Sequence, residues 1–561
     1  MNPIDVVIVG AGTAGCVLAA RLSEDRRRSV LLVEAGPDIP PAAEPPDIRS
    51  VYPLSYYNPR YAWRSLAVRW RADAGPAPFI QGRLVGGGSA VMGMWALRGF
   101  ADDYEEWEAA GARGWGWRDV MPFFAAAEHD QDFVGPMHGR AGPISVRRQP
   151  VAAWPPYCKA VATVAEDLGC ARIDDANASF ADGLCVLPIA ATDRRVSAAN
   201  AYLTPDVRSR SNLQIAARSQ CTRVTFEGLT ATGIEIAEGR NLHGVRARKV
   251  ILAAGALWSP AILMRSGVGA AEKLAAVGIR VVSHRRGVGE NLQNHPLVAL
   301  GLHLKPSAVE RNEAASPAFF SLRMTTGSRI GPRSDLYFSV LNRSSWHYFG
   351  RRLAVLGVML HKPFSRGRVD LTSADPLSPP GVDFDFLSDG RDVVALMDGL
   401  RIAAQIMADP RVSDCGRQAG LVRPTRLTRV MAERTGPSRA LDRLLSVTLP
   451  RLPALEHHLF RMVLGAVPVD LLRQASDGEL RNYVERAVSG LFHPVGTCRM
   501  GNEDDADAVV DPAGRVHGTR GLRVADASIM PTIPRAGTFL PTVMIAEKIS
   551  ADIAKSEEVY G

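Results

Sequence analysis

The first forty residues constrain the fold more than any other part of the chain, because they combine buried strands, a glycine-rich turn and a helix. The apolar run at residues 4–9 leads into Gly10, Gly12 and Gly15, and a helix is expected through residues 17–22 before a second apolar run at residues 30–34. Two fully apolar strands around a helix are typical of a parallel sheet that is covered on both faces. The sequence therefore predicts an α/β fold with a doubly wound, Rossmann-like domain.

The spacing of these glycines also predicts a bound dinucleotide. Gly10 permits a tight turn, Gly12 lets the backbone approach a pyrophosphate, and Gly15 lets the helix pack closely on the sheet. The phosphates then face the helix N-terminus. Glu34 ends the second strand, where its carboxylate can accept a hydrogen bond from a ribose hydroxyl. The neighbouring residues expected in the same site are Thr13, Ala14 and Ala35.

The length of the chain predicts its number of domains, and its charge bears on nucleic-acid binding. A chain of 561 residues is too long for one comfortable domain and predicts two that share interleaved segments. The net charge of +8 is mild and includes no long block of like charges, which gives little support to nucleic-acid binding.

The cysteines and the apolar runs bear on compartment and metal binding. The seven cysteines are odd in number and never spaced C-x-x-C, which argues against a disulfide framework and a zinc site. The adjacent pair His457 and His458 has no further ligands at helical spacing, so no metal is expected. The first strand begins at Ile4, which leaves no room for a signal peptide, and the apolar run at residues 250–264 is too short to span a bilayer. A cytoplasmic protein is expected.

Five further segments resemble the signature patterns of one enzyme family, in its order along the chain. Residues 82–90 (GRLVGGGSA) and 255–269 (GALWSPAILMRSGVG) resemble its first and second signatures, and residues 287–296 (GVGENLQNHP), 491–500 (LFHPVGTCRM) and 526–531 (DASIMP) are similar to its later segments. That family is the glucose-methanol-choline (GMC) oxidoreductases. Within it, the chain looks most like the hydroxymethylfurfural oxidases and the aryl-alcohol oxidases and dehydrogenases.

The resemblance implies tightly bound FAD and a substrate domain built on a six-stranded antiparallel sheet. It implies an FAD-binding domain made of residues 1–155, 206–300 and 486–561, interleaved with a substrate domain made of residues 156–205 and 301–485. Some members attach the flavin through a histidine of the first signature, where this chain has Val91, so non-covalent FAD is expected. By position, the resemblance assigns the rest of the cofactor site to Arg83, Val85, Gly87, Gly88, Ser89, Met92, Gly93, Cys221, Ala254, Asp526, Ala527, Thr538 and Phe539.

Residues 491–500 provide the candidate catalytic base. In the enzymes that the chain resembles, the histidine that matches His493 takes the proton of an alcohol hydroxyl while a hydride leaves the carbinol carbon for flavin N5. A positioned base of this kind contributes about 10²- to 10⁴-fold to the rate. A lone loop histidine is more often only hydrogen-bonded, and the match of the surrounding ten residues favours the base. The expected activity is oxidation of the CH–OH group of a small-molecule primary alcohol, with oxygen or a quinone-like molecule as electron acceptor.

The second catalytic position departs from the family pattern. Members usually carry an asparagine or histidine there, in a segment like P-x-x-N-T-N-x-P-T, whereas residues 534–542 read PRAGTFLPT. Both asparagines are missing, and Phe539 occupies the position of the catalytic asparagine. Met92 likewise replaces an asparagine near the flavin. Together with Trp95 and Phe492, Phe539 predicts an aromatic or apolar substrate pocket.

Three interpretations remain open for this altered site. The pocket is reshaped for a bulky aromatic or apolar alcohol with His493 still the base, which is the interpretation that we favour. Alternatively, the scaffold carries another reaction, such as a non-redox lyase or a light-driven decarboxylation, because a fold does not determine the chemistry. The third alternative is a weakly active flavin-binding protein whose role is interaction.

Residues 423–472 are rich in arginine and leucine and are longer than the matching region of the resembling oxidases. A helix pair with a solvated basic face is the favoured interpretation. A lid, a subunit contact or a peripheral membrane contact is the alternative.

Overall fold

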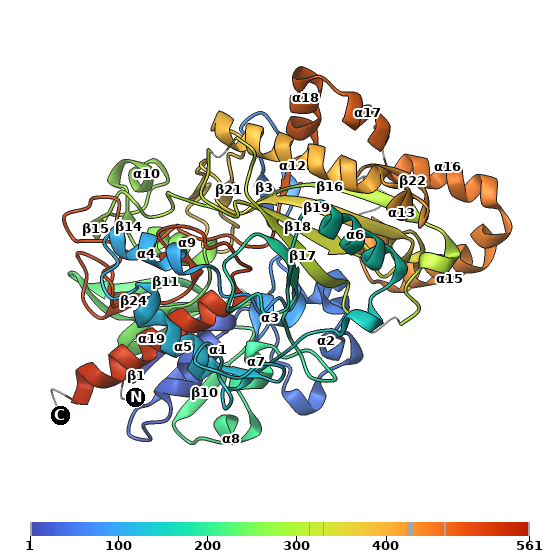
Figure 1. Ribbon diagram of the computed structural model, residues 1–561. Helices are drawn as coiled ribbons and strands as arrows, with labels where there is room; N and C mark the ends of the chain where they lie inside the picture. The colour runs from blue at the N-terminus through green and yellow to red at the C-terminus, as the bar shows by residue number, and fades with distance from the viewer. Residues whose placement is uncertain are drawn as a thin grey trace.

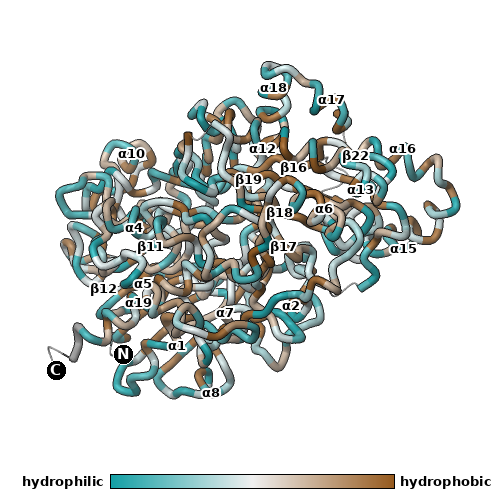
Figure 2. The backbone as a smooth tube through the Cα atoms, in the orientation of Figure 1, coloured by the Kyte–Doolittle hydropathy of each residue, from teal (hydrophilic) through white to brown (hydrophobic). Residues whose placement is uncertain are grey.

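The computed structural model describes residues 3–239, 241–312, 315–328, 330–422, 430–464 and 467–558. Two large sheets organise these residues, one at the lower left of Figure 1 and the other at its upper right. Apolar residues are concentrated along the strands of the second sheet, as Figure 2 shows. Within the described ranges, no helix combines the length and the apolar character that crossing a bilayer requires.

The first sheet has a parallel core. Its strands lie in the order β10 (Leu213–Ala216), β2 (Val30–Val33), β1 (Ile4–Val9) and β13 (Asn241–Leu252), and β24 (Leu522–Val524) also pairs with β13. β1 and β2 run in register from Val6 opposite Val30 to Val9 opposite Val33, and these side chains are buried. A fully apolar strand is stable only when both faces of the sheet are covered. The parallel arrangement and mixed α/β fold confirm the expected fold class.

An antiparallel extension completes the first sheet. The long strand β13 pairs with β1 through its second half and with β12 (Thr230–Glu238) through its first half, and β11 (Gln220–Glu227) follows β12.

Helices cover the first sheet. α1 (Thr13–Leu22) packs against α19 (Phe539–Glu558), and α19 also contacts α5 (Trp117–Ala127). α19 begins at Phe539. Pro541 lies in its first turn, where a missing N–H leaves no helical hydrogen bond unmade.

The second sheet is larger than the family resemblance implied. Its strands lie in the order β22 (Gly416–Leu421), β16 (Pro296–Leu304), β19 (Leu353–Leu360), β18 (Leu336–Leu341), β17 (Ala318–Met324), β8 (Gly183–Val186) and β7 (Arg172–Ile173), and β23 (Ser489–Gly490) also pairs with β16. The six strands from β22 to β8 run antiparallel to their neighbours, as the resemblance implied. Among the described residues, the two-residue strands β7 and β23 extend this sheet to eight strands, and β7 is parallel to β8.

The long helix α12 (Gly390–Ala408) lies across the second sheet, above it in Figure 1. Asp389 caps its N-terminus by accepting a hydrogen bond from the Arg391 amide at 2.9 Å. Gly399 lets the helix approach the sheet, because a Cβ there would lie 2.4 Å from Val358 Cγ1. The interface between α12 and β19 forms much of the core of this half of the molecule.

Smaller elements fill the remaining surface. Residues 36–80 form short helices and two short strands. The short strands are β3 (Ala67–Arg69), β4 (Ala77–Pro78), β5 (Glu128–Asp130), β6 (Ile144–Arg147), β9 (Ile189–Ala190), β14 (Val268–Gly269), β15 (Ser283–His284), β20 (Arg368–Asp370) and β21 (Gly381–Asp383). The other helices include η1 (Pro41–Ala43), α2 (Pro46–Arg49), η2 (Leu54–Tyr57), η3 (Pro59–Tyr61), α3 (Gly87–Val91), α4 (Ala101–Ala109), η4 (Val151–Ala153), α6 (Pro156–Asp167), α7 (Ala198–Tyr202), α8 (Pro205–Arg208), α9 (Trp258–Arg265), α10 (Ala271–Ala276), η5 (Pro306–Ala308), α11 (Tyr348–Arg351), α13 (Pro410–Ser413), α17 (Val469–Gln474), α18 (Asp477–Ala487) and η7 (Ala527–Ile529).

The chain passes repeatedly between the two sheets. β8 belongs to the second sheet, β10 to β13 to the first, β16 to β19 to the second again, and β24 to the first. β16 starts at Pro296 and β23 ends at Gly490, so strands of the second sheet reach a few residues beyond the expected segment ends at 300 and 485. The domain boundaries themselves stay a prediction.

The arginine- and leucine-rich segment forms helices α15 (Gly436–Thr448) and α16 (Pro453–Val463), joined by η6 (Leu449–Arg451). They project from the right edge of the molecule in Figure 1. Residues 423–429, which include Arg426 and Arg429, lie outside the described residues. The expected helix pair is present, and its exposed surface carries large apolar side chains in addition to arginines.

Candidate active site

Several glycines leave the backbone uncovered by side chains at the carboxyl end of β1. Gly10 has φ of +95°, and a Cβ there would lie 2.7 Å from the Ala253 carbonyl oxygen. A Cβ on Gly15 would lie 1.9 Å from the Gly10 oxygen, and one on Gly87 would lie 2.8 Å from Gly12 Cα. These positions tolerate only glycine, so bare backbone and the N-terminus of α1 face the space above the sheet, which suits a pyrophosphate.

Glu34 lies beside this glycine turn. Its Oε2 accepts a hydrogen bond from the Ala11 amide at 3.0 Å, and its Oε1 accepts one from the Gly36 amide at 2.8 Å. Burial raises the pKa of this carboxyl. A carboxylate has about four acceptor sites, so Glu34 can hold the turn and still accept from a ribose hydroxyl.

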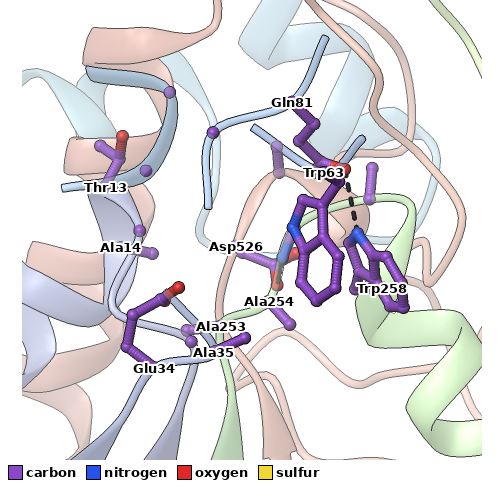
Figure 3. A pocket seen from close by; sticks show the side chains of 18 of the residues that line it. Thr13, Ala14, Glu34, Ala35, Trp63, Gln81, Ala253, Ala254, Trp258 and Asp526 are labelled. Carbon is purple, nitrogen blue, oxygen red and sulfur yellow. Dashed lines mark hydrogen bonds between the residues drawn. The ribbon is translucent and has the colours of Figure 1, made fainter. Parts of the chain in front are cut away.

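An elongated cavity runs from the glycine turn to the loop that carries His493. Among the residues expected in the site, the cavity is lined by Gly10, Gly12, Thr13, Ala14, Glu34, Ala35, Gly87, Gly88, Met92, Cys221, Ala254, Phe492, Asp526, Ala527 and Thr538. Figure 3 shows Thr13, Ala14 and Glu34 on one side of this cavity and Asp526 near its middle. Segments far apart in the sequence therefore meet around one cavity.

Several residues that were expected to bind the cofactor are not among the residues that line the cavity. The Arg83 guanidinium stacks on the Trp63 ring at 4.8 Å, and the Ser89 hydroxyl donates to the Gly86 carbonyl at 2.6 Å. Arg83 thus packs against an indole that lines the cavity, and neither Arg83 nor Ser89 is among the lining residues. Gly15, Val85 and Gly93 also fall outside the lining.

The sequence analysis missed an indole pair on the cavity wall. The rings of Trp63 and Trp258 stack with centroids 4.1 Å apart, and Trp258 Nε1 donates to Gln81 Oε1 at 3.1 Å (Figure 3). Trp63 and Gln81 lie in or next to residues 36–80, where apolar residues recur with neither helical nor strand spacing. The only available signal was the richness of that stretch in aromatic residues.

Asp526 connects the segment after β13 with the start of η7 at the cavity. Its Oδ2 accepts from the Gly255 amide at 2.8 Å and from the Ser259 hydroxyl at 2.6 Å, and its Oδ1 accepts from the Ser528 amide at 2.8 Å. Burial raises the pKa of this carboxyl. The carboxylate therefore holds the end of β13 against the start of η7, with Ala527 on the cavity wall.

His493 lies at the end of the cavity, between the lining residues Phe492 and Pro494. Its amide donates to Asn294 Oδ1 at 3.2 Å, and its Nδ1 lies 3.0 Å from Nδ1 of His295. Burial lowers the pKa of His493 to about 4, so the ring is neutral near pH 7.

The partners of His295 determine which nitrogen of His493 carries the proton. His295 Nε2 lies 3.2 Å from the Pro534 carbonyl oxygen, which only accepts, so Nε2 of His295 must be the donor. Burial keeps the pKa of His295 well below its usual range, so the ring is neutral and its Nδ1 is an acceptor. His493 must then donate from Nδ1, which leaves a lone pair on its Nε2.

Comparison with known proteins agrees with this geometry. Residues 4–297 and 363–546 match the N-terminal and C-terminal models of the family described as GMC oxidoreductase. The 5-(hydroxymethyl)furfural oxidase of Methylovorus sp. (strain MP688) is 39% identical over 563 residues, which cover 97% of this chain and 98% of that one. The chain belongs to the GMC oxidoreductase family.

Other relatives span the whole chain as well. The oxygen-dependent choline dehydrogenase of Brucella anthropi is 32% identical over 98% of this chain and 95% of its own. The crystal structure of pyridoxine 4-oxidase from Mesorbium loti superposes with a TM-score of 0.80 at 27% identity, covering 98% of this chain and 99% of that one. Family membership confirms an FAD-dependent oxidoreductase, and the glycine turn and cavity described above fit FAD.

Gly537 lies next to His493, two residues before the position expected to be the second catalytic one. A Cβ on Gly537 would lie 3.6 Å from Nε2 and 3.8 Å from Cε1 of His493, and 3.9 Å from the Trp95 carbonyl oxygen. Phe539 instead starts α19 and lies outside the cavity lining. The role expected of Phe539 at the second catalytic position stays a prediction, and Gly537 is a further candidate position beside Nε2 of His493.

Aromatic side chains surround the loop that carries His493. The Phe492 ring contacts Tyr56 with centroids 5.3 Å apart and Phe79 with centroids 5.4 Å apart. The Trp95 ring contacts Tyr337, with centroids 6.1 Å apart. The Trp95 backbone lies near Gly537, and the substrate-pocket role expected of Phe492, Trp95 and Phe539 stays a prediction.

One further cluster has the composition of a metal site. Glu128, Asp130 and His138 are buried, and one ligand atom of each lies within 4.8 Å of the others. Arg98 pairs with Glu128, and Arg148 Nη1 pairs with Asp130 at 2.8 Å. Two guanidinium groups already compensate these carboxylates, so the cluster is a buried ion-pair network.

Buried histidines predict a loss of stability in mild acid. Burial lowers the pKa of His303, His347 and His493 to about 4, and those of His295 and His361 further. Below about pH 6.5 the histidines of the unfolded chain bind protons, whereas the same rings stay neutral in the folded protein. The free energy of unfolding therefore falls as pH falls. Each ring contributes at most about 1.4 kcal/mol per pH unit.

Thermal unfolding of the FAD-loaded protein measures this effect. The midpoint Tm should fall steadily between about pH 6.5 and about pH 4, and His303→Phe should make the fall shallower by removing one of the five rings. A Tm that stays constant or rises over this interval would contradict the prediction.

Proposed function

We propose that this protein oxidises primary alcohols that carry an aromatic or apolar group to the corresponding aldehydes, with His493 as the base. The observation that carries the proposal is the hydrogen bond between His493 and His295, which leaves the Nε2 lone pair of His493 available as a proton acceptor beside Gly537. The neighbouring residues Phe492 and Pro494 line the FAD cavity.

The reaction needs a proton acceptor and a hydride acceptor. His493 takes the hydroxyl proton at Nε2, and the oxygen electrons form the carbonyl as the hydride leaves the carbinol carbon. FAD, when bound, supplies the acceptor for that hydride. The imidazolium that forms on His493 keeps donating from Nδ1 to His295, which stabilises the new charge.

The surroundings of His493 support an apolar substrate. Phe492 and Trp95 offer apolar faces, and Gly537 leaves room where a larger side chain would sit. The aromatic wall also excludes water, which strengthens the hydrogen bond between the two histidines. The names of two relatives, a (hydroxymethyl)furfural oxidase and a pyridoxine oxidase, support an alcohol borne on a ring.

Anaerobic reduction tests the proposal. The FAD-loaded protein is mixed with benzylic, furanic and aliphatic alcohols while the flavin absorbance is followed. We expect bleaching that is faster with the ring-bearing alcohols, and admission of oxygen or of a quinone then identifies the acceptor that restores the colour. If no alcohol bleaches a flavin that is demonstrably bound, the scaffold carries another reaction and the proposal fails.

Gly537→Asn should shift the substrate preference. The new Cβ makes only ordinary contacts, and the amide can bond to the substrate hydroxyl. A hydrogen bond of this kind is worth about 1.5–3 kcal/mol when it meets a charged group. We expect kcat/KM for a small aliphatic alcohol to rise about tenfold and that for a bulky benzylic alcohol to fall.

Steady-state kinetics with both alcohols measures this shift. Gly537→Ala is the control, because it fills part of the same space without a hydrogen-bonding group. Equal effects of alanine and asparagine on both alcohols would contradict the assignment of Gly537 to the second catalytic position.

A further inference from the structure

Residues 430–464, which we call the arm, form α15, η6 and α16 and project from the edge of the second sheet (Figure 1). The arm is firmly anchored at its base. Leu449, Phe460 and Leu464 are buried in a small apolar cluster with Tyr348 and Phe349. Asp442 Oδ1 accepts from the Tyr348 amide at 2.6 Å. The orientation of α15 is therefore set by its own buried face.

The opposite side of the arm is apolar and exposed. On α15, Leu444 is 59% exposed and Val447 is 58% exposed, and Leu441 lies one turn before Leu444. The turn and α16 add Leu452, Leu455 and Met462, all exposed. Apolar side chains gathered in this way on a surface mark an interaction site, because leaving them in water has a cost in free energy.

Positive charge accompanies these apolar side chains. The arm contains five arginines, Arg434, Arg439, Arg443, Arg451 and Arg461, and no lysine. Within the described parts of the chain none of the five pairs with a carboxylate.

The acidic residues of the arm leave this charge uncompensated. Asp442 pairs with Arg351 at 3.3 Å, and Glu456 is buried and pairs with Arg352 at 2.7 Å. Glu433 is the one remaining carboxylate of the arm. The exposed part of the arm therefore carries a net positive charge.

An arginine-lined cavity lies at the base of α15. Its volume is about 310 Å³, and its lining includes Arg434, Arg439 and Arg443 of the arm together with Arg343 and Arg351. Among the described residues that line the cavity, Asp442 is the single carboxylate, and it is already paired with Arg351. Guanidinium groups in this number suit a phosphate, to which arginine donates two hydrogen bonds at once.

We propose that the arm docks on a membrane surface that contains anionic phospholipid. Leu441, Leu444 and Val447 enter the boundary between head groups and acyl chains, and the arginines contact the phosphates. A helix with an apolar face beside arginines is the kind that lies in the plane of a bilayer surface. The alternative, a second copy of this chain, is disfavoured because a two-fold interface sets the same arginines of both copies against each other.

Vesicle co-sedimentation of the FAD-loaded protein tests the proposal. We expect binding to phosphatidylcholine vesicles that contain phosphatidylglycerol, weak binding to phosphatidylcholine alone, and release as salt is added. An arginine near an anionic surface contributes about fivefold to binding, so Arg439→Gln/Arg443→Gln should weaken it about 25-fold. Leu444→Glu/Val447→Glu should weaken it at least about tenfold.

The control places the same charges elsewhere on the surface. Leu229 and Leu242, which are 49% and 52% exposed on the first sheet, are replaced in Leu229→Glu/Leu242→Glu. This variant should bind vesicles like the wild type, and alcohol turnover should be unchanged in all variants. Equal vesicle binding by the wild type and the arm variants overturns the proposal. So does a dimer in solution that Leu444→Glu/Val447→Glu converts to a monomer, because a second copy then covers the arm.

Discussion

Replacing His493 by alanine should lower kcat/KM for an alcohol by about 10²- to 10⁴-fold while FAD stays bound. The imidazole lies at the end of the cavity, and the residues that face the glycine turn are untouched by the change. Without Nε2, the hydroxyl proton has to leave to water. The hydride then departs from a neutral alcohol, which is a poor donor.

The pH dependence of the two proteins separates a base from a merely structural ring. Because burial lowers the pKa of His493 to about 4, wild-type kcat/KM should be constant above about pH 5 and fall below pH 4. The alanine variant should instead rise with pH as hydroxide replaces the base. Equal pH profiles, or loss of FAD from the variant, would contradict the role of base.

Replacing His295 by phenylalanine should lower kcat/KM by about 10²-fold, the low end of what a base contributes. Phenylalanine keeps the ring that stacks on His361 at 4.5 Å but offers no acceptor to Nδ1 of His493. His493 then loses the partner that keeps its proton on Nδ1. The tautomer with the proton on Nε2 becomes populated, and that tautomer cannot accept the hydroxyl proton.

Conservative replacement gives this prediction its control. His295→Gln offers a carbonyl oxygen to the same Nδ1–H and should restore at least part of the activity. His303→Phe exchanges another buried histidine, remote from the cavity, and should leave kcat/KM unchanged. His295 would be a packing residue only if the glutamine and phenylalanine variants were equally impaired with unchanged pH profiles.

Local signals predicted the nucleotide half of the site. Gly10, Gly15 and Glu34 follow one another within a single strand–turn–helix–strand unit, so their contacts are determined by a short piece of chain. Close approach of backbone to backbone, as at Gly15 and the Gly10 oxygen, allows no other residue type. Sequence spacing is a reliable guide where the physics is local in this way.

The catalytic half depends on contacts between distant segments, and there the prediction was incomplete. His493 was found from its ten-residue context, but His295 was missed although its segment had been singled out, because the sequence does not show that the two segments pair. Gly537 and Phe539 stand where the family pattern has its two asparagines, and Phe539 was expected at the catalytic one. Only the position of each backbone relative to His493 Nε2 distinguishes them.

The ladder between residues 293–297 and 489–495 has a consequence for recombining this enzyme with its relatives. Gln293 and Val495 exchange backbone hydrogen bonds at 3.0 Å, the Leu491 amide donates to the His295 carbonyl at 3.1 Å, and Leu297 pairs with Ser489. The two histidines therefore belong to one structural module, although almost 200 residues separate them in the chain. A chimera that takes only one of these strands from a relative replaces half of the module, so productive crossovers should fall outside both stretches.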